Sequence, residues 1–92
     1  MAKLNRRVFH IVNEKGLHAR ASARLVEVVE AHNASAIVFK DGLDASGDSI
    51  MGLLMLAASR GTSIEVETSG PEAEKLADAL EALVADRFGE EF

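Results

Sequence analysis

The chain has 92 residues, of which 48% are apolar, and its formal net charge at pH 7 is −5. This length predicts a single domain, residues 1–92, with a small core. The acidic balance, with four Phe as the only aromatic residues, argues against a general nucleic-acid-binding surface. The lack of cysteine excludes a disulfide framework. No apolar run approaches the roughly 20 residues that span a bilayer, so we expect a cytoplasmic protein.

The first predicted elements are a strand and an amphipathic helix. Residues 6–12 are rich in β-branched and aromatic side chains, which favour a strand, and residues 13–16 form the turn that follows. The pattern is helical from Ala19 to about Ala31. The apolar stripe of this helix consists of Ala21, Leu25, Val28, Val29 and His32.

The middle of the chain predicts a hairpin and a second helix. A buried strand over residues 34–40 leads into Asp41-Gly42, which is one of the strongest short hairpin signals. A short return strand over residues 43–46 follows. Ser49 is well placed to cap a helix over residues 50–58.

The last predicted elements are a strand and a third helix. Residues 62–68 alternate, with Ile64 and Val66 facing the core, and Pro71 favours the start of a helix. The stripe of this helix consists of Ala73, Leu76, Ala77, Leu80, Leu83 and Val84. The order β-α-β-β-α-β-α predicts an α+β fold in which helices cover one face of a mainly antiparallel sheet.

The stretch from Gly16 to Ser22 combines a turn, a histidine and a helix start. His18 precedes the helix, where unpaired backbone N–H groups such as those of Ala19 and Arg20 attract anions. The Arg20 guanidinium suits phosphate oxygens. Because a neutral imidazole is a competent nucleophile, the stretch predicts a histidine that carries a phosphoryl group. No Asp or Glu is visible as a partner for the second ring nitrogen, which a backbone carbonyl could bind.

The charge distribution and the remaining polar candidates fit this hypothesis. The first 24 residues hold six Lys and Arg against one acid, so the histidine lies in the basic part of an acidic molecule. His10, within a strand, and His32, at a helix end, are predicted to be structural. The spacing of the three histidines matches no metal-binding pattern, so no metal site is expected.

Ser49 has two possible roles. Its spacing predicts a helix cap, and a phosphate on it would add close to two negative charges to its surroundings. The apolar residues that follow cover more than one helical face, so some of them stay exposed and can dock a partner. These residues are Ile50, Met51, Leu54 and Met55.

Two motifs give the chain a close resemblance to HPr, the histidine-containing phosphocarrier family of the bacterial phosphoenolpyruvate-dependent phosphotransferase system. They are Gly16-Leu17-His18-Ala19-Arg20 and Ser49-Ile50-Met51-Gly52-Leu53, and the resemblance covers nearly the whole chain. It implies an open-faced β-sandwich with an antiparallel sheet of four strands in the order 1-4-2-3. Three helices are expected on one face of that sheet.

The resemblance also implies a function. Enzyme I would phosphorylate His18 on Nδ1, Arg20 would steady the phosphoryl group, and an EIIA-type protein would receive it. HPr kinase/phosphorylase would modify Ser49 and thereby weaken the exchange with Enzyme I. The chain would be a monomeric carrier without cofactor or turnover of its own. Its expected docking residues are Leu17, Arg24, Ile50, Met51, Leu54 and Met55.

Two positions depart from the usual pattern of the family. Ala21 stands where proline is usual, and Asp48 stands where lysine is common before the regulatory serine. A proline at the helix start supplies no chemistry, whereas Asp48 bears on recognition by the kinase. Ala21 and the run of residues 53–56 resemble the nitrogen-related branch familiar from alphaproteobacteria, which implies a regulatory role beyond sugar uptake.

Two other functions are alternatives to the carrier. A non-catalytic regulatory module would bind partners through residues 50–55 under the control of Ser49, with His18 vestigial. The intact stretch from Gly16 to Arg20 argues against that module. A small hydrolase is disfavoured because the sequence shows no Ser or Cys nucleophile with a paired base.

Overall fold

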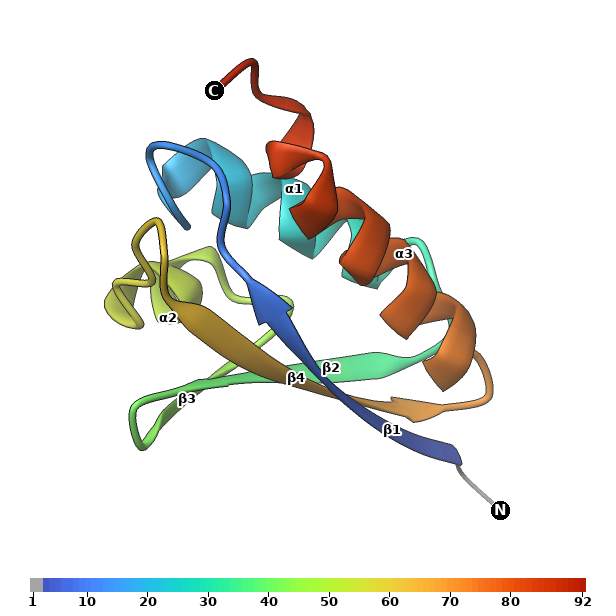
Figure 1. Ribbon diagram of the computed structural model, residues 1–92. Coiled ribbons are helices and arrows are strands. Elements are labelled where there is room, and N and C mark those ends of the chain that lie inside the picture. Colours follow the sequence, from blue (N-terminus) through green and yellow to red (C-terminus); the bar gives the residue numbers. More distant parts are fainter. Residues whose placement is uncertain (1–2) are drawn as a thin grey trace.

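The computed structural model describes residues 3–92 as a layer of strands covered by a layer of helices (Figure 1). The elements follow the predicted order. Their bounds are β1 Lys3–His10, α1 Ala19–Glu30, β2 Ser35–Lys40, β3 Leu43–Ser46, α2 Ile50–Met55, β4 Ser63–Gly70, α3 Ala73–Ala85 and the 3₁₀ helix η1 Arg87–Gly89. Among residues 3–92, no helix combines the length and the apolar character that crossing a membrane requires.

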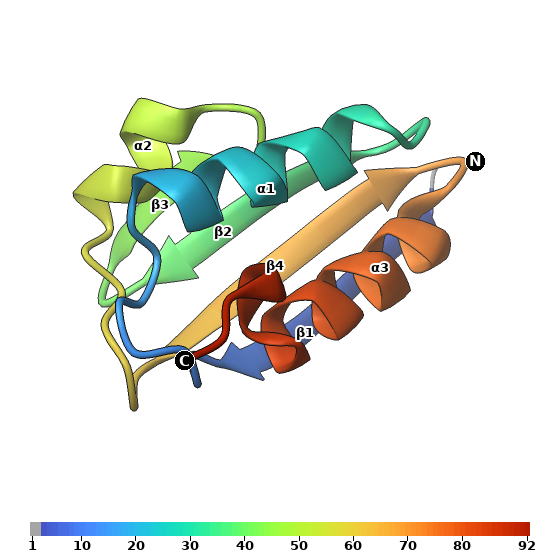
Figure 2. The same cartoon turned by 90° about the horizontal axis from the view of Figure 1, so that it is seen from above.

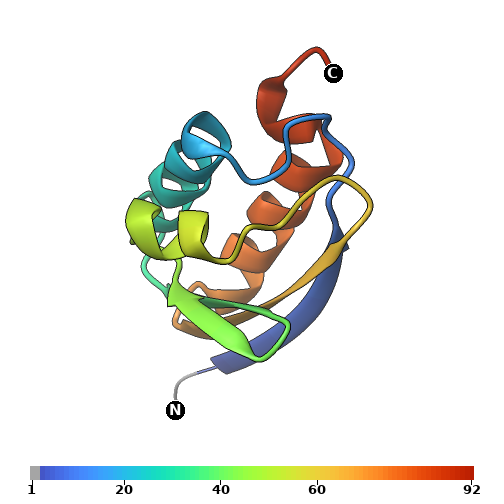
Figure 3. The same ribbon diagram turned by 90° about the vertical axis from the view of Figure 1, so that its left-hand side faces the viewer.

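The strands form one antiparallel sheet of four in the order β1-β4-β2-β3. Strand β1 pairs with β4 along its whole length, from Lys3 opposite Gly70 to His10 opposite Ser63. Helices α1, α2 and α3 all lie against the same face of this sheet (Figures 2 and 3). The strand order and the one-sided helical cover that the family resemblance implies are therefore confirmed.

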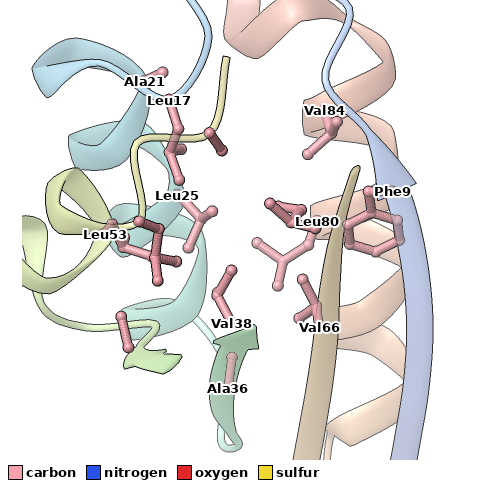
Figure 4. Close-up of a cluster of buried hydrophobic side chains, with 14 of the residues drawn as sticks. Phe9, Leu17, Ala21, Leu25, Ala36, Val38, Leu53, Val66, Leu80 and Val84 are labelled. Carbon is pink, nitrogen blue, oxygen red and sulfur yellow. The ribbon is translucent and has the colours of Figure 1, made fainter. Parts of the chain in front are cut away.

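The buried face of the sheet follows from the two-residue period of its strands. In β4, Ile64 and Val66 are buried, as predicted, while Glu65 lies on the opposite face. In β2, Val38 is buried and its neighbour Ile37 is exposed. Figure 4 shows the side chains that meet between the layers, including Phe9, Leu25, Val38, Leu53, Val66 and Leu80.

Helix α1 buries a broader arc than the predicted stripe. Its buried residues are Ala21, Ser22, Leu25, Val26 and Val29. Val28 and His32, which the prediction placed on the stripe, are only half-buried. The arc is broad because α1 lies between α2 and α3 and packs against both (Figure 2).

The sequence pattern misplaces the start of the first strand and the end of the last strand. The first strand was predicted over residues 6–12 but spans Lys3–His10, and the last was predicted over residues 62–68 but continues to Gly70. The added residues are mostly polar and show little strand pattern. They are extended because each strand satisfies the backbone hydrogen bonds of the other.

The second helix is shorter than predicted. It was expected over residues 50–58 but ends at Met55. Ala57 adopts a left-handed φ of 52°, which a continuing α-helix does not allow. The flanking Leu56 and Ala58 are both buried in the core. This turn takes the chain from α2 towards the loop that precedes α1.

Candidate functional site

The loop before α1 is held by a buried turn. Gly16 has a φ of 65°, and a Cβ added there would lie 2.4 Å from the carbonyl oxygen of Ala58, so the position requires glycine. Leu17 donates its N–H to the same oxygen at 2.8 Å. Asn13 closes the turn, because its side-chain Nδ2 donates to the Gly16 carbonyl at 2.8 Å. These contacts fix the position at which the chain enters α1.

His18 is the N-cap residue of α1. Its backbone is extended, and its carbonyl oxygen accepts the first helical hydrogen bond, from the Ser22 N–H at 2.8 Å. Within residues 3–92, no side chain caps this helix end. The N–H groups of Ala19 and Arg20 therefore have no partner inside the helix. The imidazole, whose side chain is 26% exposed, thus stands at the positive end of the helix dipole.

Glu90 binds the His18 ring from the far end of the chain. One carboxylate oxygen of Glu90 forms a hydrogen bond with Nε2 of His18, and the other accepts from Nδ2 of Asn13 at 2.8 Å. Burial raises the pKa of the Glu90 carboxyl, but the hydrogen bonds from Asn13 and His18 outweigh burial. The resulting pKa lies below the ordinary value of 4.5.

The protonation of the ring follows from this contact. Glu90 is ionised near neutral pH, and a carboxylate only accepts hydrogen bonds, so Nε2 of His18 carries a proton. The second nitrogen, Nδ1, has no hydrogen-bond partner within residues 3–92. In the neutral ring Nδ1 therefore holds the available lone pair.

Phe88 anchors the tail that carries Glu90. Its side chain is 1% exposed in the core. Arg87, Phe88 and Gly89 have left-handed φ angles of 55°, 55° and 78°, which turn the chain back after α3. The Glu90 N–H then donates to the Arg87 carbonyl at 2.9 Å. The tail consequently lies beside the loop that precedes α1 (Figures 1 and 3).

A pocket of about 300 Å³ opens between this tail and the start of α1. Its charged lining is mixed: three cationic residues, Lys15, Arg20 and Arg24, face three acidic ones, Glu14, Glu90 and Glu91. Arg20 and Arg24 are exposed and one helical turn apart, so they share a face of α1. The contact of Arg20 with a phosphoryl group on His18 stays a prediction.

Ser49 lies at the second predicted site, the start of α2. Its Oγ accepts a hydrogen bond from the Gly52 N–H at 3.0 Å, so the serine caps the helix, as its spacing predicts. The apolar side chains that α2 leaves exposed or half-buried form the α2 patch: Ile50, Met51, Leu54 and Met55. Met51 and Met55 are 71% and 76% exposed.

The α2 patch and His18 lie at the same end of the molecule. Helix α2 packs against α1, and the Leu17–Ala58 hydrogen bond ties the segment after α2 to the residue before His18 (Figure 1). Leu17 itself is 3% exposed, so its side chain belongs to the core and contributes no docking surface. Arg24, the remaining predicted docking residue, is exposed on α1.

The other two histidines make local contacts. His10 is exposed on β1, and its Nδ1 lies 2.8 Å from Oγ of Ser63 on the neighbouring strand. Nδ1 of His32 lies 2.7 Å from the carbonyl oxygen of Val28, one helical turn earlier. No group of three or more side chains within residues 3–92 is arranged to hold a metal ion.

Two members of the site, Glu90 and Asn13, were missed by sequence reasoning, which found no acidic partner for His18. Glu90 lies 72 residues from His18, a separation to which no local spacing rule applies. A weak signal is present in Phe88 and Gly89, an apolar residue and a glycine after the third helix, which indicate a packed turn.

Comparison with known proteins finds relatives that are similar to this chain over most of its length. The family model described as the PTS HPr component phosphorylation site matches residues 5–86. Phosphocarrier protein HPr of Cupriavidus necator is 44% identical over 80 residues, which cover 87% of this chain and 90% of that protein. Phosphocarrier protein NPr of Escherichia coli K12 is 37% identical over 82 residues, which cover 88% and 91%.

Solved structures of proteins named HPr also resemble this chain in fold. HPr-C-His from Thermoanaerobacter tengcongensis superposes with a TM-score of 0.90 at 32% identity, covering 96% of this chain and 99% of that one. Phosphocarrier protein HPr from Bacillus anthracis gives a TM-score of 0.84 at 32% identity, covering 88% and 96%. The shared fold thus includes nearly every element described above.

Proposed function

Because the chain belongs to the HPr family of phosphocarriers of the phosphotransferase system, we propose that it carries a phosphoryl group on His18 between two other proteins. The donor in this proposal is Enzyme I, charged by phosphoenolpyruvate, and the acceptor is an EIIA-type protein. Proteins named HPr and NPr both occur among the relatives. We expect the acceptor to belong to a sugar-transport or a nitrogen-regulation route, as the family resemblance implies. The exchange would take place in the cytoplasm.

The observation that carries the proposal is the placement of His18 at the uncapped start of α1. Nε2 is bound to Glu90, which leaves Nδ1 as the nucleophile. In the transfer, the Nδ1 lone pair forms a bond to phosphorus. The bond between phosphorus and the donor breaks, and its electron pair leaves with the donor. Passing the group to the acceptor repeats the same exchange, with His18 as the leaving group.

The surroundings of His18 suit a phosphoryl anion. The unpaired N–H groups of Ala19 and Arg20 are donors already held in place by the helix, and they need no rearrangement during the transfer. The Arg20 guanidinium adds a fixed positive charge from the adjoining pocket. Such positioning and charge stabilisation are what phosphoryl transfer requires of a protein.

The α2 patch supplies the docking surface in this proposal. A carrier must bind its donor and its acceptor in turn and release both, which favours a small contact area. Exposed methionines adapt to different partner surfaces because their side chains are flexible. The patch has this composition, and it lies beside the His18 loop.

Ser49 is the proposed regulatory position. A phosphate on its Oγ would place about two negative charges next to the α2 patch and oppose docking of Enzyme I. HPr kinase/phosphorylase is the enzyme expected to add it. The exposed Asp48, whose Oδ1 accepts from Ser46 Oγ at 2.6 Å, precedes the site with a negative charge where lysine is common. We therefore expect slower modification by that kinase than lysine would allow.

The proposal is tested by incubating the protein with Enzyme I and labelled phosphoenolpyruvate. Wild type should acquire one label that is lost in acid and stable in base, as a phosphohistidine is. The His18→Ala variant should acquire none. His10→Ala is the matched control, because it removes an exposed histidine from β1 and should label like wild type.

Two results would contradict the carrier. One is a wild-type protein that takes no label from active Enzyme I, as expected of a regulatory module with a vestigial histidine. The other is a label that persists in His18→Ala. Transfer of the label from the wild-type protein onward to an EIIA-type protein completes the test.

A further inference from the structure

Asn13, Glu90 and His18 form a continuous hydrogen-bonded chain. Asn13 is fully buried, and its Nδ2 donates both to the Gly16 carbonyl and to Glu90, at 2.8 Å each. Both partners are acceptors, so the amide nitrogen must face them. Glu90, whose side chain is 14% exposed, extends the chain to Nε2 of His18. The carboxylate is thus held on one side by a rigid turn and aimed at the ring on the other.

The backbone that delivers Glu90 is strained. Arg87 and Phe88 both have a φ of 55°, although neither is glycine. Such a backbone is unfavourable for a residue with a side chain, because its Cβ lies too close to a carbonyl oxygen. Burial of Phe88 in the core offsets this cost and holds the turn. A strained, anchored turn that ends on the reactive ring is typical of a segment selected for positioning.

We propose that Glu90 is a positioning residue for the transfer at His18. It keeps the proton on Nε2, so that Nδ1 always presents its lone pair, and it balances the charge that the ring gains in the transfer. This role rests on the proposed function, because it assumes that His18 accepts the phosphoryl group. Asn13 acts indirectly, because its side chain holds the Glu90 carboxylate by a hydrogen bond.

The charge balance follows from the bonds that change. Before the transfer, the neutral ring has a proton on Nε2 and a lone pair on Nδ1. When Nδ1 bonds to phosphorus, the Nε2 proton stays on the ring, because an imidazole nitrogen is a stronger base than the Glu90 carboxylate that it contacts, and the ring becomes positively charged. The Glu90 carboxylate already contacts that proton, so it stabilises the charge without moving. When the group passes on, the ring returns to the neutral form with Nε2 still protonated.

The test compares Glu90→Gln with Glu91→Gln. Each variant removes one negative charge from the same tail, but Glu91 is exposed whereas Glu90 contacts His18. A glutamine at position 90 keeps the size and an acceptor for Asn13. It can also donate to Nε2, so it no longer selects one tautomer. Two readouts are taken: the ring ¹⁵N shifts of His18, which report its tautomer, and the rate of phosphorylation by Enzyme I.

We expect Glu90→Gln to populate both tautomers and to accept the phosphoryl group on the order of tenfold more slowly. Glu91→Gln should keep the wild-type ¹⁵N shifts and stay within about twofold of the wild-type rate. A merely structural role for Glu90 would lower the melting temperature and leave the tautomer unchanged, which would overturn the proposal. Equal transfer rates for the two variants would also overturn it.

The two proposals fail in different ways. If wild type takes no phosphate on His18, the proposed function fails. If wild type is phosphorylated on His18 and Glu90→Gln behaves like Glu91→Gln, only the role of Glu90 is overturned. Equal melting temperatures for the two variants show that the tail is still folded when the rates are compared.

Discussion

Gly16 shows how one residue can control the geometry of the site. Its left-handed backbone and its approach to the Ala58 carbonyl leave no room for a side chain. We expect Gly16→Ala to lower the free energy of unfolding by about 3 kcal/mol, because backbone strain and a backbone clash act together. Urea unfolding followed by circular dichroism measures the loss.

The matched control for this substitution is Gly42→Ala in the β2–β3 hairpin. Gly42 also has a positive φ, of 82°, but a Cβ added there meets nothing within 4 Å. It should therefore cost only the backbone strain, about 1 kcal/mol. Equal losses for Gly16→Ala and Gly42→Ala would show that the contact with Ala58 is unimportant.

Helix α2 depends on its cap more than a longer helix would. It has six residues, and only Leu53 is buried among them. The Ser49→Ala variant should lose about 1 kcal/mol of stability, because the Gly52 N–H loses its acceptor. Hydrogen exchange at the Gly52 amide should accelerate accordingly.

The control for the cap is Ser46→Ala. It removes an exposed hydroxyl bonded to Asp48 and should change stability by less than about 0.5 kcal/mol. Unchanged exchange at Gly52 in Ser49→Ala would refute the capping role.

At the scale of the whole molecule, the His18 ring and the apolar α2 patch lie at one end. Met51→Asp together with Met55→Asp should slow phosphorylation by Enzyme I on the order of tenfold, because charge on the α2 patch opposes docking. Stability should change by less than about 0.5 kcal/mol per site, since both side chains are highly exposed. Steady-state transfer at varied Enzyme I concentration measures the effect.

The control for the patch is Leu4→Asp. Leu4 is 67% exposed on the edge strand β1, which pairs at that point with the far end of β4. It adds one negative charge, against two in the paired methionine variant, to an exposed apolar position at the other end of the sheet, so the slowing is compared per added charge. If Leu4→Asp slows transfer as much as the paired methionine substitutions, the α2 patch is not the docking surface.

Much of the fold could be predicted because its determinants are local. The alternation over residues 62–68 and the Asp41-Gly42 turn each lie within a few residues of chain, where period and turn chemistry act directly. The cap at Ser49 and the placement of His18 before α1 follow from the same kind of local pattern. The element order, most of the core faces and the position of His18 were accordingly accessible from the residues, together with the family resemblance.

The partner of His18 was decided by the tertiary structure alone. A hydrogen bond between residues 72 positions apart leaves no period or motif in the sequence. It exists because Phe88 packs into a core shared by the sheet and all three α-helices of the described chain, and that packing directs the last residues over the start of α1. The extra residues of β1 and β4 have the same origin, since each strand is extended by pairing with the other. Local sequence thus placed His18 at the start of α1, and long-range packing supplied the carboxylate that binds its ring.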